Sequence, residues 1–182
     1  MDLGRPWVLR GLVIALAVVV GVVAYVATRG GDDEEPARGA EAGEARIVSE
    51  EELADIASTA EYPVYWVGPL PDTELELTDS GEAGVLLRYL REDDEVGAAI
   101  ADRVAVGSYP LQNPEKALDN FAERPGAIVG DAPEVGRTVT NARARTSVYF
   151  VDPGNEVQVE VYAPTPKRAM SLIRSGQVVP VG

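Results

Sequence analysis

Residues 147–176 read SVYFVDPGNEVQVEVYAPTPKRAMSLIRSG, and this stretch decides the fold that we expect for the chain. It contains two segments rich in β-branched and aromatic residues, 147–151 and 156–162, which turn-forming Asp, Pro, Gly and Asn residues separate. In the second segment valines alternate with polar residues, a pattern typical of a strand with one buried face and one wet face. The stretch therefore predicts a β-hairpin with one hydrophobic side.

A helix is expected directly after this hairpin. Thr165 is a suitable N-cap residue, Pro166 suits the first helical position, and Gly176 supplies a helix end. The apolar residues between them, Leu172 and Ile173 included, recur on one side and are expected to face inward.

Two segments nearer the N-terminus carry signals of the same kind. Ser49 and Glu52 have the spacing of a capping box, which predicts an amphipathic helix within residues 47–60. The aromatic run YPVYWV, residues 62–67, predicts a strand, and Pro63 places it at a sheet edge because proline cannot donate a ladder hydrogen bond.

The remaining elements complete the expected fold class. Further strands are expected at 75–78, 85–90, 103–109 and 137–140, with a last short strand within 177–181. Asn113 is expected to cap a further helix that has Pro114 at its first position. The rest of residues 124–146 shows no regular pattern. The sequence thus predicts an α+β domain with a small, mostly antiparallel sheet and two or three packed helices.

A weak internal sequence similarity suggests a duplication within this domain. Tyr109-Pro110 before a Pro-started helix is similar in order and chemistry to Tyr162 and Pro164 before the helix that starts at Pro166. One hypothesis is therefore a duplicated strand–strand–helix (ββα) unit. The alternative is that any strand leading into a Pro-started helix has this appearance.

The N-terminal part of the chain is expected to cross a membrane. Residues 11–27 read GLVIALAVVVGVVAYVA, carry no charge, and with their flanks reach the roughly 20 residues that a transmembrane helix needs. Arg5 and Arg10 precede this stretch, so residues 1–10 are expected in the cytoplasm and 11–28 in the membrane. The alternative is a cleavable secretory signal, and both interpretations export the rest of the chain.

Residues 29–46, RGGDDEEPARGAEAGEAR, are small, polar and acidic, and this composition predicts a disordered linker. Residues 47–182 are then the extracytoplasmic domain. The whole chain has a formal net charge of −14, which argues against nucleic acid as a partner.

The composition also excludes several kinds of chemistry. The chain has neither cysteine nor histidine, so disulfides, thiolate metal sites, cysteine nucleophiles and Ser-His-Asp triads are impossible. Four consecutive acids at 92–95 lack the spacing of a calcium loop and are interpreted as a solvated turn. We expect no catalytic residues, no metal and no cofactor.

Two groups of residues are candidates for binding. Tyrosine and tryptophan are favoured at recognition surfaces, which singles out Tyr62, Tyr65 and Trp66, although about half of these rings should be core because strand side chains alternate. The second group is a basic cluster that is suited to a carboxylate or phosphate ligand, and its alternative role is to neutralise the acidic domain locally. Its members are Arg137, Arg143 and Arg145.

At YPVYWVGP, LLRYLRED, VGSYP and VQVEVYAPTPKRAMSLIRSGQV the sequence resembles uncharacterised bacterial proteins with one N-terminal span and a small exported α+β domain. The resemblance covers residues 60–181 and implies a shared fold, but no reaction.

These patterns predict a single-pass protein of the bacterial cell membrane with its N-terminus in the cytoplasm. Its extracytoplasmic domain is expected to bind an envelope protein or ligand without catalysis. The alternatives are an envelope hydrolase that uses carboxylates, and a small-ligand sensor subunit that acts through its span.

Overall fold

The computed structural model of the chain describes residues 43–182. The predicted membrane helix at 11–28 and most of the linker at 29–46 lie outside these residues. Among the helices of residues 43–182, none has the length and apolar character needed to cross a membrane.

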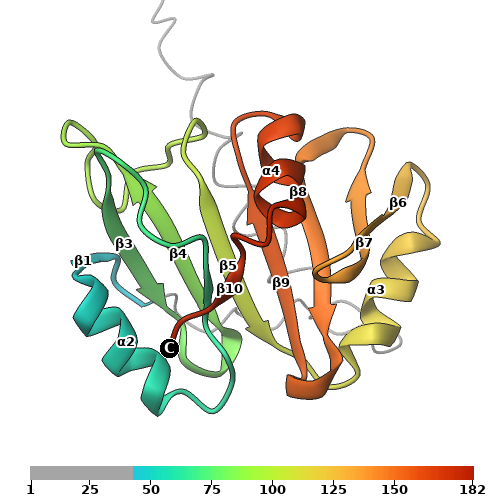
Figure 1. Cartoon of the computed structure of the whole chain (residues 1–182), viewed down its shortest axis with the longest axis horizontal. Helices are drawn as coiled ribbons and strands as arrows, with labels where there is room; N and C mark the ends of the chain where they lie inside the picture. The colour runs from blue at the N-terminus through green and yellow to red at the C-terminus, as the bar shows by residue number, and fades with distance from the viewer. Residues whose placement is uncertain (1–42) are drawn as a thin grey trace, which may run out of the picture.

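The described part consists of ten strands and three helices (Figure 1). In chain order they are β1 (Arg46–Val48), α2 (Glu50–Thr59), β2 (Tyr65–Trp66), β3 (Glu74–Asp79), β4 (Val85–Leu90), β5 (Ala105–Pro110), α3 (Pro114–Ala122), β6 (Ala127–Ala132), β7 (Gly136–Asn141), β8 (Ala144–Asp152), β9 (Val157–Tyr162), α4 (Pro166–Arg174) and β10 (Val179–Pro180).

Eight of these strands form one antiparallel sheet in the order β1-β3-β4-β5-β9-β8-β7-β6, and β2 and β10 form a separate two-stranded sheet. The α+β class is thus confirmed, but the prediction of a small sheet is wrong. The main reason is that residues 124–146, for which the sequence predicts only a short strand at 137–140, contain the whole of both β6 and β7. These two strands pair over six residues, from Ala127 opposite Asn141 to Ala132 opposite Gly136.

The hairpin predicted at 147–162 is confirmed as β8 and β9, with Phe150 opposite Val159 and Asp152 opposite Val157. The predicted wet face of β9 is wrong, because Gln158 and Glu160 are only 2% and 6% exposed. β9 lies between β5 and β8 near the middle of the sheet, and side chains cover it on both sides.

One face of the sheet carries the main hydrophobic core. The valines of β9, with Val148 and Phe150 of β8, pack in one cluster with Leu53 of α2, and with Leu172 and Ile173 of α4. β10 lies over this face between α2 and α4 (Figure 1), and β2 pairs with it. We call this face of the sheet the core face.

The opposite face carries α3. Phe121 of α3 meets Tyr149 of β8 edge to face, with ring centroids 5.1 Å apart. Tyr149 points away from the core face because its neighbours Val148 and Phe150 point towards it. On this second face the ring of Tyr109 lies over Gly107, which is opposite Glu160 in β9, so tyrosine rings rather than water surround the polar residues of β9.

The helix starts show how local sequence fixed these elements. Ser49 and Glu52 form the predicted capping box, with the Glu52 N–H donating to Ser49 Oγ at 3.1 Å and the Ser49 N–H donating to Glu52 Oε2 at 2.9 Å. Thr165 caps α4 in a similar way. Asn113 occupies the N-cap position of α3 but has φ of 57° and makes no side-chain cap hydrogen bond, so its predicted capping role is wrong.

The strand–strand–helix pattern occurs twice, but the duplication hypothesis gains no support. β5 precedes α3 and β9 precedes α4, and these two strands pair antiparallel at the centre of the sheet. A repeat related across that pair would place both helices on one face. Instead α4 packs on the core face and α3 packs on the other.

Candidate functional site

The aromatic run at 62–67 does not form an edge strand of the main sheet. Only Tyr65 and Trp66 are in a strand, β2, and they pair with β10 above the core face. The predicted strand is thus shorter than expected, and it lies at the edge of a separate two-stranded sheet, because period and composition identify an extended segment but not the layer in which it lies. Tyr62 and Trp66 are half-buried, and the Tyr62 hydroxyl donates to the Gly81 carbonyl at 3.3 Å.

Tyr65 is held at its ring, its backbone and its hydroxyl group. Its ring packs edge to face on Phe150 with centroids 5.9 Å apart, and its N–H donates to Ser108 Oγ at 2.8 Å. Its hydroxyl donates to Asp152 Oδ2 at 2.7 Å. Burial, together with the adjacent Asp152 carboxylate, raises the pKa of Tyr65, so the hydroxyl remains a neutral donor at ordinary pH.

This tyrosine lies at a groove of about 420 Å³ on the core face, which we call the Tyr65 groove. The groove runs between β10, the end of β8 and the turn that joins β6 to β7. Its lining residues are Tyr65, Glu134, Val135, Phe150, Val151, Asp152, Gly176, Val178, Val179 and Pro180. They include two carboxylates, Glu134 and Asp152, and no basic side chain. The groove therefore has mainly apolar walls and a net negative charge.

Asp152 is the fixed charge of this groove. Its Oδ2 accepts from the Tyr65 hydroxyl and from Asn155 Nδ2, both at 2.7 Å. Its Oδ1 accepts no hydrogen bond from any residue in the described range. One oxygen of a rigidly held carboxylate is therefore available to a ligand.

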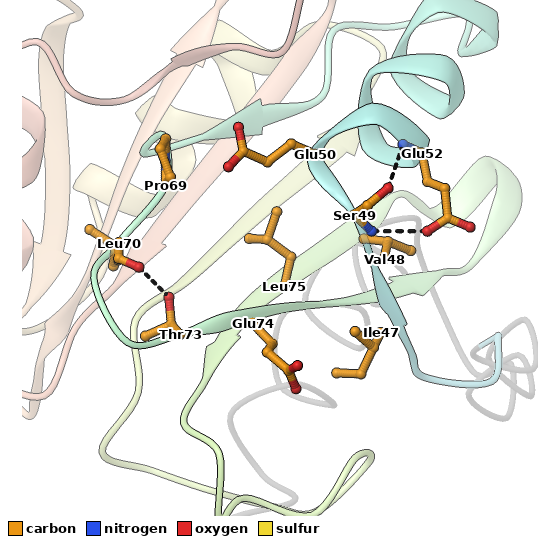
Figure 2. A pocket seen from close by; sticks show the side chains of 10 residues that line it. All are labelled: Ile47, Val48, Ser49, Glu50, Glu52, Pro69, Leu70, Thr73, Glu74 and Leu75. Atoms are coloured by element: carbon orange, nitrogen blue, oxygen red, sulfur yellow. Dashed lines mark hydrogen bonds between the residues drawn. The ribbon is translucent and has the colours of Figure 1, made fainter.

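A second groove of about 380 Å³ lies between the start of α2 and the start of β3 (Figure 2). It too combines apolar side chains with carboxylates, here from Glu50, Glu52 and Glu74, and has no basic lining residue. In Figure 2 the Glu50 side chain extends towards Pro69, whereas Glu52 turns back to Ser49. The hydrogen bond from the Ser49 backbone lowers the pKa of Glu52, so this carboxylate already serves the helix cap.

The three candidate arginines do not form one site. Arg137 is the second residue of β7 and makes an ion pair with Asp119 of α3, whereas Arg143 lies in the turn beyond the other end of β7. Arg145 follows on β8, and both it and Arg143 are exposed. The predicted basic cluster is therefore wrong in its geometry, and Arg137 plays the alternative role of local neutralisation.

The acidic turn at 92–95 is tied to a neighbouring arginine. Arg103 donates to both carboxylate oxygens of Asp94, with Nη2 2.6 Å from Oδ1. These hydrogen bonds lower the pKa of Asp94 to about 2. No group of three or more potential metal-binding side chains occurs in the described range.

Two buried glutamates are not predicted by the sequence patterns. Glu76 is fully buried, forms an ion pair with Arg88, and accepts from the Gly97 N–H at 2.7 Å. Glu160 accepts from the Tyr149 hydroxyl at 2.9 Å, and burial raises the pKa of its carboxyl group. Both alternate with apolar residues in their strands, a pattern that predicts solvent-exposed polar side chains. The structure covers them instead, Glu160 among tyrosine side chains on the α3 side of the sheet and Glu76 beside the loop that contains Gly97.

No protein-family model matches this chain, and comparisons with curated proteins and with solved structures also give no match.

Proposed function

We propose that this chain is a membrane-anchored, extracytoplasmic binding protein of the bacterial cell envelope, without catalytic activity, and that the Tyr65 groove is its partner site. The observation that carries the proposal is the Tyr65–Asp152 pair at the base of this groove. A hydroxyl and a carboxylate fixed 2.7 Å apart, among apolar walls, form a preorganised recognition element.

The membrane part of the proposal rests on the sequence alone. The uncharged stretch at 11–27 has the length of a span, and Arg5 and Arg10 precede it. The similarity in motifs to bacterial proteins with one span and an exported domain supports the same placement.

The charge pattern favours binding over hydrolysis. A carboxylate-based hydrolase needs two carboxyl groups across one cleft, one of them with a raised pKa. Asp152 and Glu134 line the Tyr65 groove, but Glu160, whose pKa is raised, points to the opposite face of the sheet.

Site-directed photo-crosslinking in intact cells tests this function. A photoreactive residue at the exposed position Val179, on the Tyr65 groove, is expected to label one recurrent envelope protein, and it should stop doing so when the groove is altered by Tyr65→Phe with Asp152→Asn. Val96, an equally exposed valine in the loop between β4 and β5, is the matched control.

The same cells test the placement of the chain. The full chain is expected in the membrane fraction after alkaline washing, with the domain open to protease added outside the inner membrane. Recovery of the chain in the cytosol, or equal labelling from Val179 and Val96, would show that the proposed function is wrong.

A further inference from the structure

We infer that the Tyr65 groove receives an extended, basic segment of a protein partner, which adds to the free edge of β10 as a new strand and places a lysine or arginine against Asp152 and Glu134. This inference rests on the proposed function of the same groove and specifies the chemistry of its partner.

The free edge of β10 follows from the pairing of β10 with β2. Val179 is opposite Trp66, and the Val181 N–H donates to the Val64 carbonyl at 2.8 Å. Backbone groups alternate in direction along a strand, so the groups of Val179 and Val181 face β2, and those of Val178 and Pro180 face away.

These outward groups lie on the groove and have no hydrogen-bond partner in the described part of the chain. Val178 and Pro180 line the Tyr65 groove, and the Val178 N–H makes no hydrogen bond within residues 43–182. Val178 is also buried, and a buried N–H without a partner is unfavourable. An added strand would satisfy the N–H and carbonyl of Val178 and then donate to the Pro180 carbonyl.

The charge of the groove selects a basic segment. Asp152 keeps Oδ1 free of hydrogen bonds from described residues, and Glu134 is exposed on the turn that forms the opposite rim. No lysine or arginine lines the groove, and the chain as a whole carries a net charge of −14. A basic segment is attracted to this site, whereas an acidic peptide or an anionic lipid surface is repelled.

The apolar walls set the remaining requirement. Val135, Val151 and Val179, which are half-buried or exposed, offer a surface for hydrophobic side chains beside the carboxylates. Side chains of an extended segment alternate in direction, so an apolar residue can enter the groove while a basic neighbour reaches the rim. The partner segment is therefore extended, with apolar and basic residues interleaved.

Peptide binding to the full chain in uncharged detergent tests the inference. The probes are fluorescent acetyl-Lys-Val-Lys-Val-Lys-Val-amide and the same peptide with glutamate in place of lysine. We expect the lysine peptide alone to bind, more weakly as salt is added, and Asp152→Asn and Glu134→Gln each to weaken it about three- to tenfold. Glu123→Gln removes one exposed acid at the end of α3 and is expected to leave the affinity unchanged.

Backbone methylation tests strand addition separately from charge. One probe carries N-methyl groups on its valine amides and the other on its lysine amides. Alternate amides point to opposite edges of a strand, so one methylated probe is expected to bind as before and the other to lose binding. Equal behaviour of the two methylated probes would overturn strand addition.

Other results would overturn either the basic partner segment or the proposed function, and the two cases can be told apart. Binding of both unmethylated peptides, or unchanged binding by the Asp152→Asn, Glu134→Gln double variant, would overturn the basic segment. If Val179 still crosslinks specifically to an envelope partner, only this inference fails, whereas loss of that crosslink overturns the proposed function itself. Thermal unfolding checks that each variant folds. If Asp152→Asn does not fold, the exposed Glu134→Gln variant alone tests the role of the negative charge.

Discussion

Two carboxyl groups on opposite faces of the sheet, Asp152 and Glu160, each accept a hydrogen bond from a tyrosine hydroxyl, at 2.7 Å and 2.9 Å. Their surroundings make them different. Asp152 is half-buried at a groove, whereas Glu160 lies among buried side chains, where burial raises the pKa of its carboxyl group. The first residue is placed to meet a ligand, and the second affects mainly the pH dependence of folding.

Glu160→Gln is expected to change how stability depends on pH. The folded protein holds the Glu160 proton to higher pH than the unfolded chain does, whose reference pKa is 4.5. The contribution of Glu160 is therefore fully present below about pH 4.5 and is lost as the pH rises through the raised folded value. The variant has no such loss. The difference in unfolding free energy, variant minus wild type, should therefore increase as the pH rises.

Urea unfolding of both proteins between about pH 4 and pH 8 measures this difference. The chain has no histidine that would titrate in the same range. A constant difference in unfolding free energy across the range would show that Glu160 keeps an ordinary pKa.

Substitutions at Tyr65 separate its hydroxyl from its ring. Tyr65→Phe removes the hydrogen bond to Asp152 and is expected to cost about 1–2 kcal/mol of unfolding free energy. Tyr65→Ala also removes a ring that is only 7% exposed, and should cost about 3–5 kcal/mol. Chemical denaturation measures both, and equal costs would mean that the ring packing on Phe150 contributes little.

At the level of the elements, hairpins and helix starts were predictable from sequence and layers were not. The β8–β9 hairpin and the Ser49–Glu52 capping box follow from local signals, and the structure has both. The aromatic run at 62–67 has equally clear local signals, yet it lies above the sheet because tertiary packing decides its partner.

The candidate site was predictable only in part for the same reason. Tyr65 was singled out by its residue type, but Asp152 was interpreted as a turn residue and the β10 edge as a short terminal strand. Only the fold brings Tyr65, Asp152 and Val178 together. Within residues 124–146 the sequence predicts only the strand at 137–140. It gives no signal for β6, because a three-residue turn, followed by the left-handed Gly136 at the start of β7, joins strands that contain little hydrophobic alternation.

Substitutions of Gly136, at the start of β7, test the role of this connection in stability. Gly136 has φ of 72° and open space where a Cβ would lie, so Gly136→Ala should cost about 1–2 kcal/mol through backbone conformation alone. Gly136→Asn should cost less, because asparagine tolerates the left-handed region better. Denaturant unfolding compares the two variants, and equal losses would point to a lost contact instead.

For the whole molecule, the central pairing of β5 with β9 joins the N-terminal and C-terminal halves over six residue pairs. One hydrophobic cluster also includes residues of both halves, from Val48 to Val178. We therefore expect the domain to unfold in one cooperative step.

Two probes test this expectation. With Trp7→Phe, fluorescence reports Trp66 alone, while far-ultraviolet circular dichroism reports the whole sheet. The two denaturation curves should coincide. Separate midpoints would show that the halves unfold independently.

The outermost strand β6 has a practical consequence for anyone who purifies this protein. It ends the sheet with six residues, AIVGDA, that contain no lysine, arginine or proline, and Ile128 and Val129 are 39% and 52% exposed. An exposed edge strand of this kind can pair with strands of other molecules, so concentrated preparations should slowly form oligomers. Val129→Lys should suppress this association, which light scattering measures. The proposed membrane anchor would hold all copies in one orientation and so limit pairing of these edge strands.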